Sequence, residues 1–203
     1  MINNVSVIIL AAGHSERMKT PKPFLLFDEK RSFLDKITKT YISAGIQDII
    51  LVISPVIEER VRQVLKRNYP AKHIRIVVNP FQERGRFYSF QLGLDKAGSS
   101  NCFLQNIDNP FVTGKLLIAM GKLIRQGYCV VPVFGDKKGH PVLVSAEVVN
   151  HCRKLEGYEY NIREQLAKFP EIKLEWRDEN ILANINSADQ YKKYFTSCEV
   201  FMK

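Results

Sequence analysis

Apolar positions along the chain fall into short blocks that alternate between two spacings. Residues 5–11 are mostly apolar and β-branched, which is typical of a strand buried on both faces of a sheet. Residues 33–42 carry their apolar side chains at helical spacing instead, and residues 48–54 return to the buried-strand pattern. A helix beginning at Pro55 and a strand over residues 73–79 complete a β-α-β-α-β succession. This order predicts a parallel sheet that is covered by helices and binds ligands at the carboxyl ends of its strands.

The second half continues the alternation, without an internal repeat or a low-complexity linker. We therefore expect one three-layer α/β/α domain over residues 1–203, with a mostly parallel central sheet. The further elements predicted are a helix opened by Gly85, a strand over 102–107, a helix capped by Thr113, strands over 128–134 and 140–144, an edge strand over 172–176, and a last helix that Ser187 and Gln190 begin as a capping box.

The composition is typical of a soluble globular protein, with 45% hydrophobic and 25% charged residues among 203. No apolar run approaches the ~20 residues that a membrane-spanning helix needs, and we expect no signal peptide. The cysteines form no Cys-x-x-Cys pair, which favours buried, reduced thiols in a cytoplasmic protein over a metal site. They are Cys102, Cys129, Cys152 and Cys198.

The formal net charge of +9 raises the question of a nucleic-acid partner. The positive residues spread over residues 17–39, 60–75, 84–86 and 122–138, mixed with acidic residues, and no helix concentrates them beside aromatic side chains. A small anionic substrate explains this distribution more simply than a nucleic acid does. We expect no nucleic acid and no membrane among the partners.

The loop after the first strand carries the main candidate chemistry. Small residues at Ala12 and Gly13 would let backbone N–H groups approach a polyphosphate closely. Arg17 can fork onto phosphate oxygens, and Lys22 can act on them as a point charge. The alternative is an ordinary first strand followed by a solvated basic loop, and the residue types alone do not decide between the two.

The spacing of this loop favours the phosphate site. Leu10-Ala-Ala-Gly-x-Ser-x-Arg-Met with Lys22 resembles the phosphate-binding signature of nucleotidyltransferases of the glycosyltransferase-A-like fold. It is most similar to the branch that contains the molybdenum-cofactor cytidylyl- and guanylyltransferases. The resemblance implies that the nucleotide is bound by Leu10, Ala11, Ala12, Gly13, Ser15, Arg17 and Lys22.

A second segment, residues 79–94, resembles the Gly-Met-x-x-Ser-Leu-x-x-Gly-Leu motif of the same family. The resemblance implies that Asn79, Gly85 and Ser89 contribute to the site of the base and ribose. Read without the family, the segment is a loop followed by the start of a helix.

Asp108 follows a predicted central strand and precedes Pro110, where a carboxylate is well placed to hold a divalent cation. Without the family it reads as a turn residue, but it resembles the Asp-x-Pro motif whose aspartate binds Mg²⁺. The closing segment has Asn184 and Asn186 where some relatives have aspartate. We hypothesise that Asn186, rather than Asn184, completes the Mg²⁺ shell opposite Asp108. Both asparagines can instead cap the last helix.

His140 begins a stretch that resembles the Gly-x-Pro-Val-Leu strand lining the acceptor side in the cytidylyltransferase branch. It is either an acceptor-binding donor or a residue packed against Tyr128. The segment near Tyr158 lacks the acidic residue of that branch, so the resemblance does not specify a pterin as the acceptor.

Together the resemblance implies a Mg²⁺-dependent nucleotidyltransferase, with Arg17, Lys22 and Asp108 as the catalytic residues. A methyl group at Ala12, where guanylyl-transferring relatives usually have glycine, predicts CTP as the preferred triphosphate. The acceptor would be a phosphorylated small molecule, as in molybdenum-cofactor cytidylyltransferases. The alternatives are a transferase for sugar 1-phosphates or other phosphorylated metabolites, and a relative that binds nucleotide without turnover.

Overall fold

The computed structural model describes residues 4–13, 18, 20–69, 74–98 and 100–195. The strands are β1 (Val5–Ala11), β2 (Asp48–Ile53), β3 (Ile74–Val78), β4 (Asn101–Asn106), β5 (Cys129–Phe134), β6 (Lys137–Lys138), β7 (Val142–Val144) and β8 (Glu171–Glu175). The helices are α1 (Phe33–Ser43), α2 (Glu58–Asn68), α3 (Gly85–Leu94), α4 (Gly114–Leu123), α5 (Ala146–Lys154), α6 (Ile162–Leu166) and α7 (Ala188–Tyr194), with short 3-10 helices at Lys22–Phe24, Pro55–Ile57, Gln82–Arg84 and Glu179–Leu182.

The strands form one sheet in the order β3-β2-β1-β4-β7-β5-β6, and β8 pairs with β5. Strands β1 to β4 are mutually parallel where they pair, β7 runs antiparallel between β4 and β5, and β8 is parallel to β5. The predicted α/β fold with a mostly parallel sheet is confirmed. The expected edge position of residues 172–176 is also confirmed, because β8 has one partner and a half-exposed pattern.

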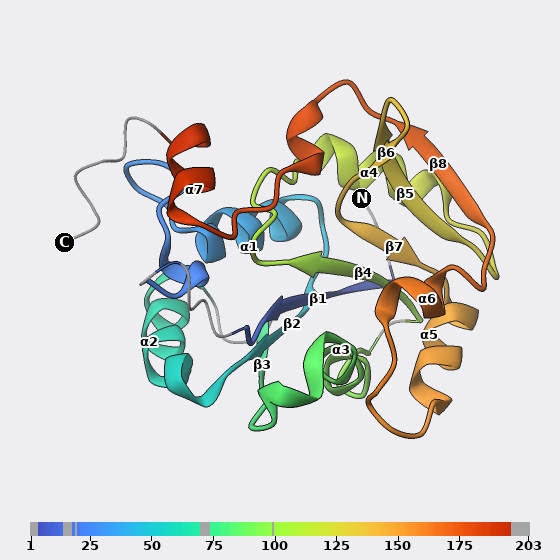
Figure 1. Ribbon diagram of the computed structural model, residues 1–203, viewed down its shortest axis with the longest axis horizontal. Coiled ribbons are helices and arrows are strands. Elements are labelled where there is room, and N and C mark those ends of the chain that lie inside the picture. The colour runs from blue at the N-terminus through green and yellow to red at the C-terminus, as the bar shows by residue number, and fades with distance from the viewer. Residues whose placement is uncertain (1–3, 14–17, 19, 70–73, 99, 196–203) are drawn as a thin grey trace.

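Helices cover both faces of the sheet and enclose two hydrophobic cores (Figure 1). On one face α1, α4 and α7 bury Phe33, Leu116 and Tyr191. On the other, α3 and α5 bury Phe90 and Val148, and α6 adds Leu166. Because β1 is buried along its whole length, its sequence is apolar at every position except Ser6.

Parallel pairing brings the carboxyl ends of β1 and β4 to the same edge of the sheet. Leu10 lies opposite Asn106, and the N–H of Ile107 donates to the carbonyl oxygen of Leu10 at 3.1 Å. The segment before α7 reaches the same edge, since the N–H of Ile185 donates to the carbonyl oxygen of Asp108 at 2.9 Å. Residues from the beginning, the middle and the end of the chain therefore meet at this edge.

Helix caps agree with the sequence in part. The Thr113 side chain accepts a hydrogen bond from the N–H of Leu116 and caps α4, as predicted. The Ser187 side chain likewise accepts from the N–H of Gln190, but the Gln190 carboxamide accepts from Asn186 instead of completing a capping box with Ser187. The Gln190 side chain thereby holds the backbone of Asn186 in place.

Three of the cysteines, Cys102, Cys129 and Cys152, are buried and unpaired, as expected, and Cys198 lies outside the described residues. Burial raises the pKa of the Cys129 thiol to about 12 and that of Cys152 to about 11, so both remain protonated at neutral pH. None of the helices described in the structure has the length and apolar character that crossing a membrane would require.

Candidate active site

A cavity of about 300 Å³ lies at the carboxyl ends of β1 and β4. It opens between the turn after β1, the first turn of α3 and the segment before α7. The lining residues are Leu10, Ala11, Ala12, Gly13, Lys22, Arg86, Ser89, Asn106, Ile107, Asp108, Asn184 and Asn186.

The turn after β1 leaves open space beside its backbone. Ala12 is buried, whereas Gly13 is exposed, and no described atom lies within 4 Å of where a Cβ on Gly13 would be. Glycine is therefore not required here by contacts within the described protein. Open room beside backbone N–H groups suits the close approach of a phosphate.

Lys22 links two distant parts of the chain within this cavity. Its Nζ lies 3.2 Å from Oδ2 of Asp108 and 2.5 Å from Oδ1 of Asn186. The side chains of Lys22 and Asp108 are only 16% and 20% exposed, so the ion pair is shielded from water and is more than a surface contact. The 3-10 helix Lys22–Phe24 and the segment before α7 together set this geometry.

The same oxygens fit a divalent cation. The ammonium group of Lys22 is a cation that both Asp108 and Asn186 bind. In addition, Oδ1 of Asp108 is buried and has no hydrogen-bond partner among the described residues. The described residues contain no group of three or more His, Cys, Asp or Glu side chains that would hold a metal by themselves. Mg²⁺ is usually held by one or two carboxylates together with substrate phosphates and waters. The carboxylate of Asp108 and the amide oxygen of Asn186 fit this type of coordination.

A network of amide side chains that the sequence did not reveal braces the site. The Asn109 carboxamide donates to the carbonyl oxygen of Ala183 and to Oδ1 of Asn184, at 3.0 Å to the latter, and accepts from Nδ2 of Asn106. Asn106 and Asn109 are buried, and Gln105 donates to the backbone carbonyl oxygen of each. Asn184 therefore belongs to this hydrogen-bond network, whereas Asn186 contacts the ammonium group of Lys22.

Of the residues predicted to contact the base and ribose, only some line the small cavity. Ser89 lines the cavity, but Asn79 is buried beneath it, where it donates to Ser89 Oγ at 2.9 Å and accepts from the N–H of Phe81. Gly85 does not line the cavity either. Its φ of 79° lies in the left-handed region, which explains a glycine between a 3-10 helix and α3. Ser15 and Arg17 lie outside the described residues.

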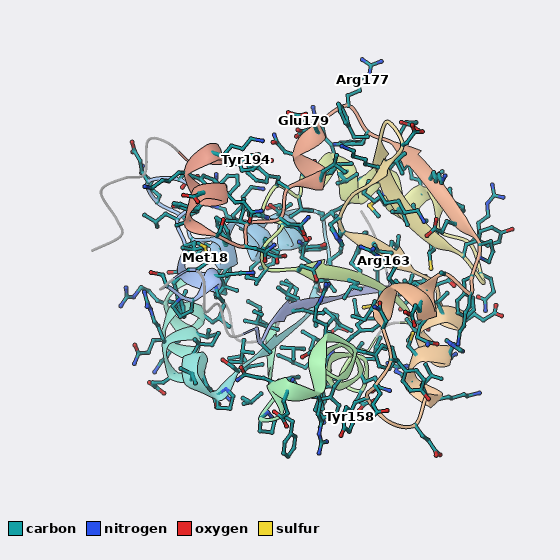
Figure 2. The ribbon with its side chains drawn as sticks, viewed as in Figure 1. Met18, Tyr158, Arg163, Arg177, Glu179 and Tyr194 are labelled. Carbon is teal, nitrogen blue, oxygen red and sulfur yellow. The ribbon has the colours of Figure 1, made fainter. Side chains whose placement is uncertain are left out.

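A larger cavity of about 940 Å³ is lined in part by Arg86 and Phe87 of α3. His140 lines it together with Arg163, which projects from the first turn of α6 and is labelled in Figure 2. Its wall is completed by β5, β6 and the segment before α6, with Tyr160 beside the buried ring of Phe87 at a centroid distance of 5.4 Å. The structure thus places His140 in a cavity wall, as one of the two alternatives requires.

His140 is held in its place by backbone packing. Its N–H donates to the carbonyl oxygen of Ile181, and a Cβ on Gly139 would come within 2.8 Å of that same oxygen, so only glycine allows this approach. Burial lowers the pKa of His140 to about 4, with a further lowering from Arg86 and Arg163 that Asp108 partly offsets. The imidazole is therefore neutral at pH 7, and its buried Nδ1 has no hydrogen-bond partner among the described residues.

A parallel-sheet α/β domain with a small-residue turn, a lysine and a strand-end aspartate at one edge defines a domain of the nucleotidyltransferase type. The family described as "MobA-like NTP transferase domain" matches residues 7–171, and the chain belongs to this family. The match includes residues 7–11 of β1, the turn after it, Lys22, Asp108 and His140.

Individual relatives are more distant. The chain is 26% identical over 137 residues to a probable molybdenum cofactor guanylyltransferase of Methanosarcina mazei, an alignment over 68% of this chain and 61% of that protein. It therefore spans less than two thirds of that relative's length. Among solved structures, Rv0371c from Mycobacterium tuberculosis superposes with a TM-score of 0.77 at 20% identity, covering 97% of this chain and 99% of that one. A nucleotidyl transferase from Methanothermobacter thermautotroptrophicus gives 0.77 at 19% identity, covering 94% and 95%.

Proposed function

We propose that this protein is a metal-dependent nucleotidyltransferase that transfers a nucleoside monophosphate to a phosphorylated small molecule. An oxygen of the acceptor phosphate forms a bond to the α-phosphorus of the triphosphate. The bond from the α-phosphorus to the bridging oxygen of the β-phosphate breaks, and its electron pair leaves with pyrophosphate. No general base is needed, because a phosphate oxygen is already an anion.

The observation that carries this proposal is the position of Lys22 between Asp108 and Asn186, beside the turn at Gly13. Backbone N–H groups of residues 12–15, with Arg17, would hold the β- and γ-phosphates, and Lys22 would move onto the α-phosphate. Asp108 and Asn186 would hold Mg²⁺, which supplies charge neutralisation on the phosphates when bound. The protein's own contribution is alignment of the reactants and preorganised positive charge.

Two triphosphates are candidates, and a different observation favours each. Ala12 is one of the residues that line the small cavity, and an alanine at this position favours CTP over a purine. The Methanosarcina relative is a probable guanylyltransferase, which favours GTP. We keep CTP as the prediction, and calorimetric titration of the protein with CTP, UTP, GTP and ATP in the presence of Mg²⁺ decides it. Tighter binding of GTP than of CTP would overturn the preference.

The acceptor side is the larger cavity with His140. A molybdenum cofactor precursor and other phosphorylated metabolites, including sugar 1-phosphates, are the acceptor classes to test. The decisive experiment measures pyrophosphate release from each triphosphate with a panel of these acceptors, and Asp108→Asn provides the inactive control. Release with one acceptor and its loss in the variant support the proposal. Tight triphosphate binding without release would identify a non-catalytic relative, and salt-dependent duplex binding without triphosphate preference would identify a nucleic-acid-binding protein.

A further inference from the structure

Arg86 lies at the junction of the two cavities. It is the second residue of α3, and among the described residues it alone lines both the small cavity with Asp108 and the large cavity with His140. A group that binds at Arg86 is therefore in reach of the nucleotide and of the acceptor at once. Arg86 directly follows Gly85, and nothing in its sequence neighbourhood indicates this position.

The guanidinium of Arg86 is anchored on one side only. One of its terminal nitrogens donates to Oδ1 of Asn106 at 2.7 Å. That oxygen is aimed by the buried Asn106 carboxamide, whose nitrogen donates to Asn109 at 3.1 Å. No other hydrogen bond and no carboxylate partner of Arg86 is found within the described part of the chain. The remaining N–H donors of its fork are open to the cavities, in the geometry that binds a carboxylate or phosphate with two parallel hydrogen bonds.

The larger cavity has an excess of positive charge that its own acids do not balance. Glu171 is the one acidic side chain among the described lining residues, and it pairs with Lys138 at 2.5 Å. Arg86, Lys137 and Arg163 have no such partner among the residues that the structure describes. A mainly apolar surface completes the lining: Phe87, Leu104, Val131, Val142, Ile162 and Leu166. The cavity therefore suits a ligand that joins an anionic group to an apolar or flat body.

The charge state of His140 bears on which groups of the larger cavity can attract an anion. Arg86 of α3 and Arg163 of α6 line the same cavity as His140, and both guanidinium groups lower the pKa of its imidazole. Asp108 is the acidic group that acts on it in the opposite direction. At neutral pH the imidazole adds no charge, so Arg86, Arg163 and Lys137 are the described groups of this cavity left to attract an anion.

We propose that Arg86 binds an anionic group of the acceptor at the junction of the two cavities, with Arg163 on the far side, and thereby determines which acceptors reach the α-phosphorus. This inference rests on the transferase function proposed above and adds a specificity-determining residue to it. Arg86 is preferred to Arg163 for the main test because it alone adjoins the triphosphate site.

The test uses phenyl phosphate as an anionic probe with an apolar ring, and phenol as its uncharged counterpart. Each is titrated by calorimetry into protein saturated with Mg²⁺ and the triphosphate that binds most tightly. Wild type should bind phenyl phosphate saturably and phenol at least ~10-fold more weakly, because a charge-assisted pair of hydrogen bonds is lost with the phosphate. Arg86→Met should weaken the binding of phenyl phosphate ~10- to 100-fold and leave triphosphate affinity nearly unchanged. The affinity of Arg86→Lys for phenyl phosphate should lie between those of wild type and Arg86→Met.

Arg84→Met is the matched control. Arg84 lies two residues earlier, but its guanidinium packs over the rings of Phe81 and Tyr158, 4.1 and 4.9 Å from their centroids, away from both cavities. Its removal changes the net charge by the same amount and should leave phenyl phosphate binding intact. Figure 2 labels Tyr158 on the segment that leads toward Arg163. If Arg86→Met does not fold, Arg86→Lys and Arg163→Met carry the test, each with an expected loss of probe affinity.

The inference is overturned if wild type loaded with triphosphate fails to bind phenyl phosphate. It is also overturned if Arg84→Met weakens the probe as much as Arg86→Met does. An equal loss of triphosphate and probe affinity in Arg86→Met would assign Arg86 to the nucleotide instead. None of these results decides whether the protein is a transferase. The transferase proposal is contradicted by a different result, namely that no acceptor in the panel gives pyrophosphate release.

Discussion

Asp48 and Asp108 lie at opposite ends of the parallel part of the sheet, and their surroundings differ in kind. Asp48 is the first residue of β2, and its carboxylate is fully occupied. It accepts hydrogen bonds from Ser6 Oγ, from the N–H of Gly98 at 2.8 Å and from the guanidinium of Arg75. Burial alone raises the pKa of Asp48, but these three donors outweigh it and hold the pKa below its usual range.

Asp108 follows β4 at the other end, and only one of its two carboxylate oxygens has a partner among the described residues. One carboxylate oxygen is bound by Lys22, and the other is buried with no partner among the described residues. Buried polar atoms are normally satisfied, so an unsatisfied carboxylate oxygen at the carboxyl edge of the sheet indicates a ligand that the protein lacks by itself. The amino-terminal edge therefore contributes hydrogen bonds to the fold, and we propose that the carboxyl-terminal edge binds a ligand.

The largest effect expected is on activity. Asp108→Asn should lower metal-dependent pyrophosphate release by at least ~10²–10³-fold, because a preorganised charge at the reacting phosphate is lost. Asp48→Asn should leave the rate per folded molecule unchanged. Both rates are measured with the acceptor found in the screen. Equal losses in the two variants would abolish the distinction between the two edges.

Lys22→Ala tests the second member of the carboxyl-edge site. If Lys22 acts mainly on charge that develops at the α-phosphorus, its removal should lower turnover ~10²-fold and weaken triphosphate binding much less. Calorimetry gives the affinity and steady-state kinetics give the rate. Unchanged turnover would reduce Lys22 to a structural partner of Asp108.

Stability should respond in the opposite order. Asp48→Ala removes a carboxylate that three groups bind, and it should lower the free energy of unfolding by about 1.5–3 kcal/mol. Asp108→Ala should lower it by less, because it also removes a buried oxygen without a partner. Urea unfolding at pH 7 measures both. A larger loss for Asp108→Ala would show that its site contributes more to folding than to binding.

The smallest effect expected is a shift in acid sensitivity from His140. Its folded pKa of about 4 lies below the ordinary value near 6.5, so the unfolded chain binds the proton first. The native state is therefore penalised progressively as pH falls from about 6.5 to about 4. Replacement by Gln removes this penalty, so His140→Gln should lose less stability than wild type between pH 7 and pH 5 in urea unfolding. An identical loss would place the His140 ring in water.

Local sequence patterns were sufficient for the fold class, and the resemblance to family motifs singled out much of the site. The buried run of β1, the cap at Thr113 and the turn position of Asp108 each depend on a few neighbouring residues. The small cavity accordingly contains Ala12, Lys22 and Asp108, which the sequence had singled out.

The remainder depends on contacts between distant segments. Lys22 and Asn186 are 164 residues apart, and Asn79 could be distinguished from a lining residue only by its burial under Ser89. Arg86 was missed for the same reason, since nothing in the residues around it tells that two cavities meet at its side chain. Such features arise from contacts between segments that are distant in the sequence, and no local pattern indicates them.

The most direct test of the proposed site is whether Asp108 couples the binding of metal to the binding of triphosphate. Triphosphate affinity is measured by calorimetry with Mn²⁺ and again with EDTA, in wild type and in Asp108→Asn. Mn²⁺ is a suitable probe because it is bound by the same carboxylate, carbonyl and water oxygens as Mg²⁺. If Asp108 holds the metal, Mn²⁺ should strengthen triphosphate binding strongly in wild type and have little effect in Asp108→Asn. If the variant shows the same dependence on Mn²⁺ as wild type, the metal is held elsewhere and the site described at the carboxyl edge is wrong.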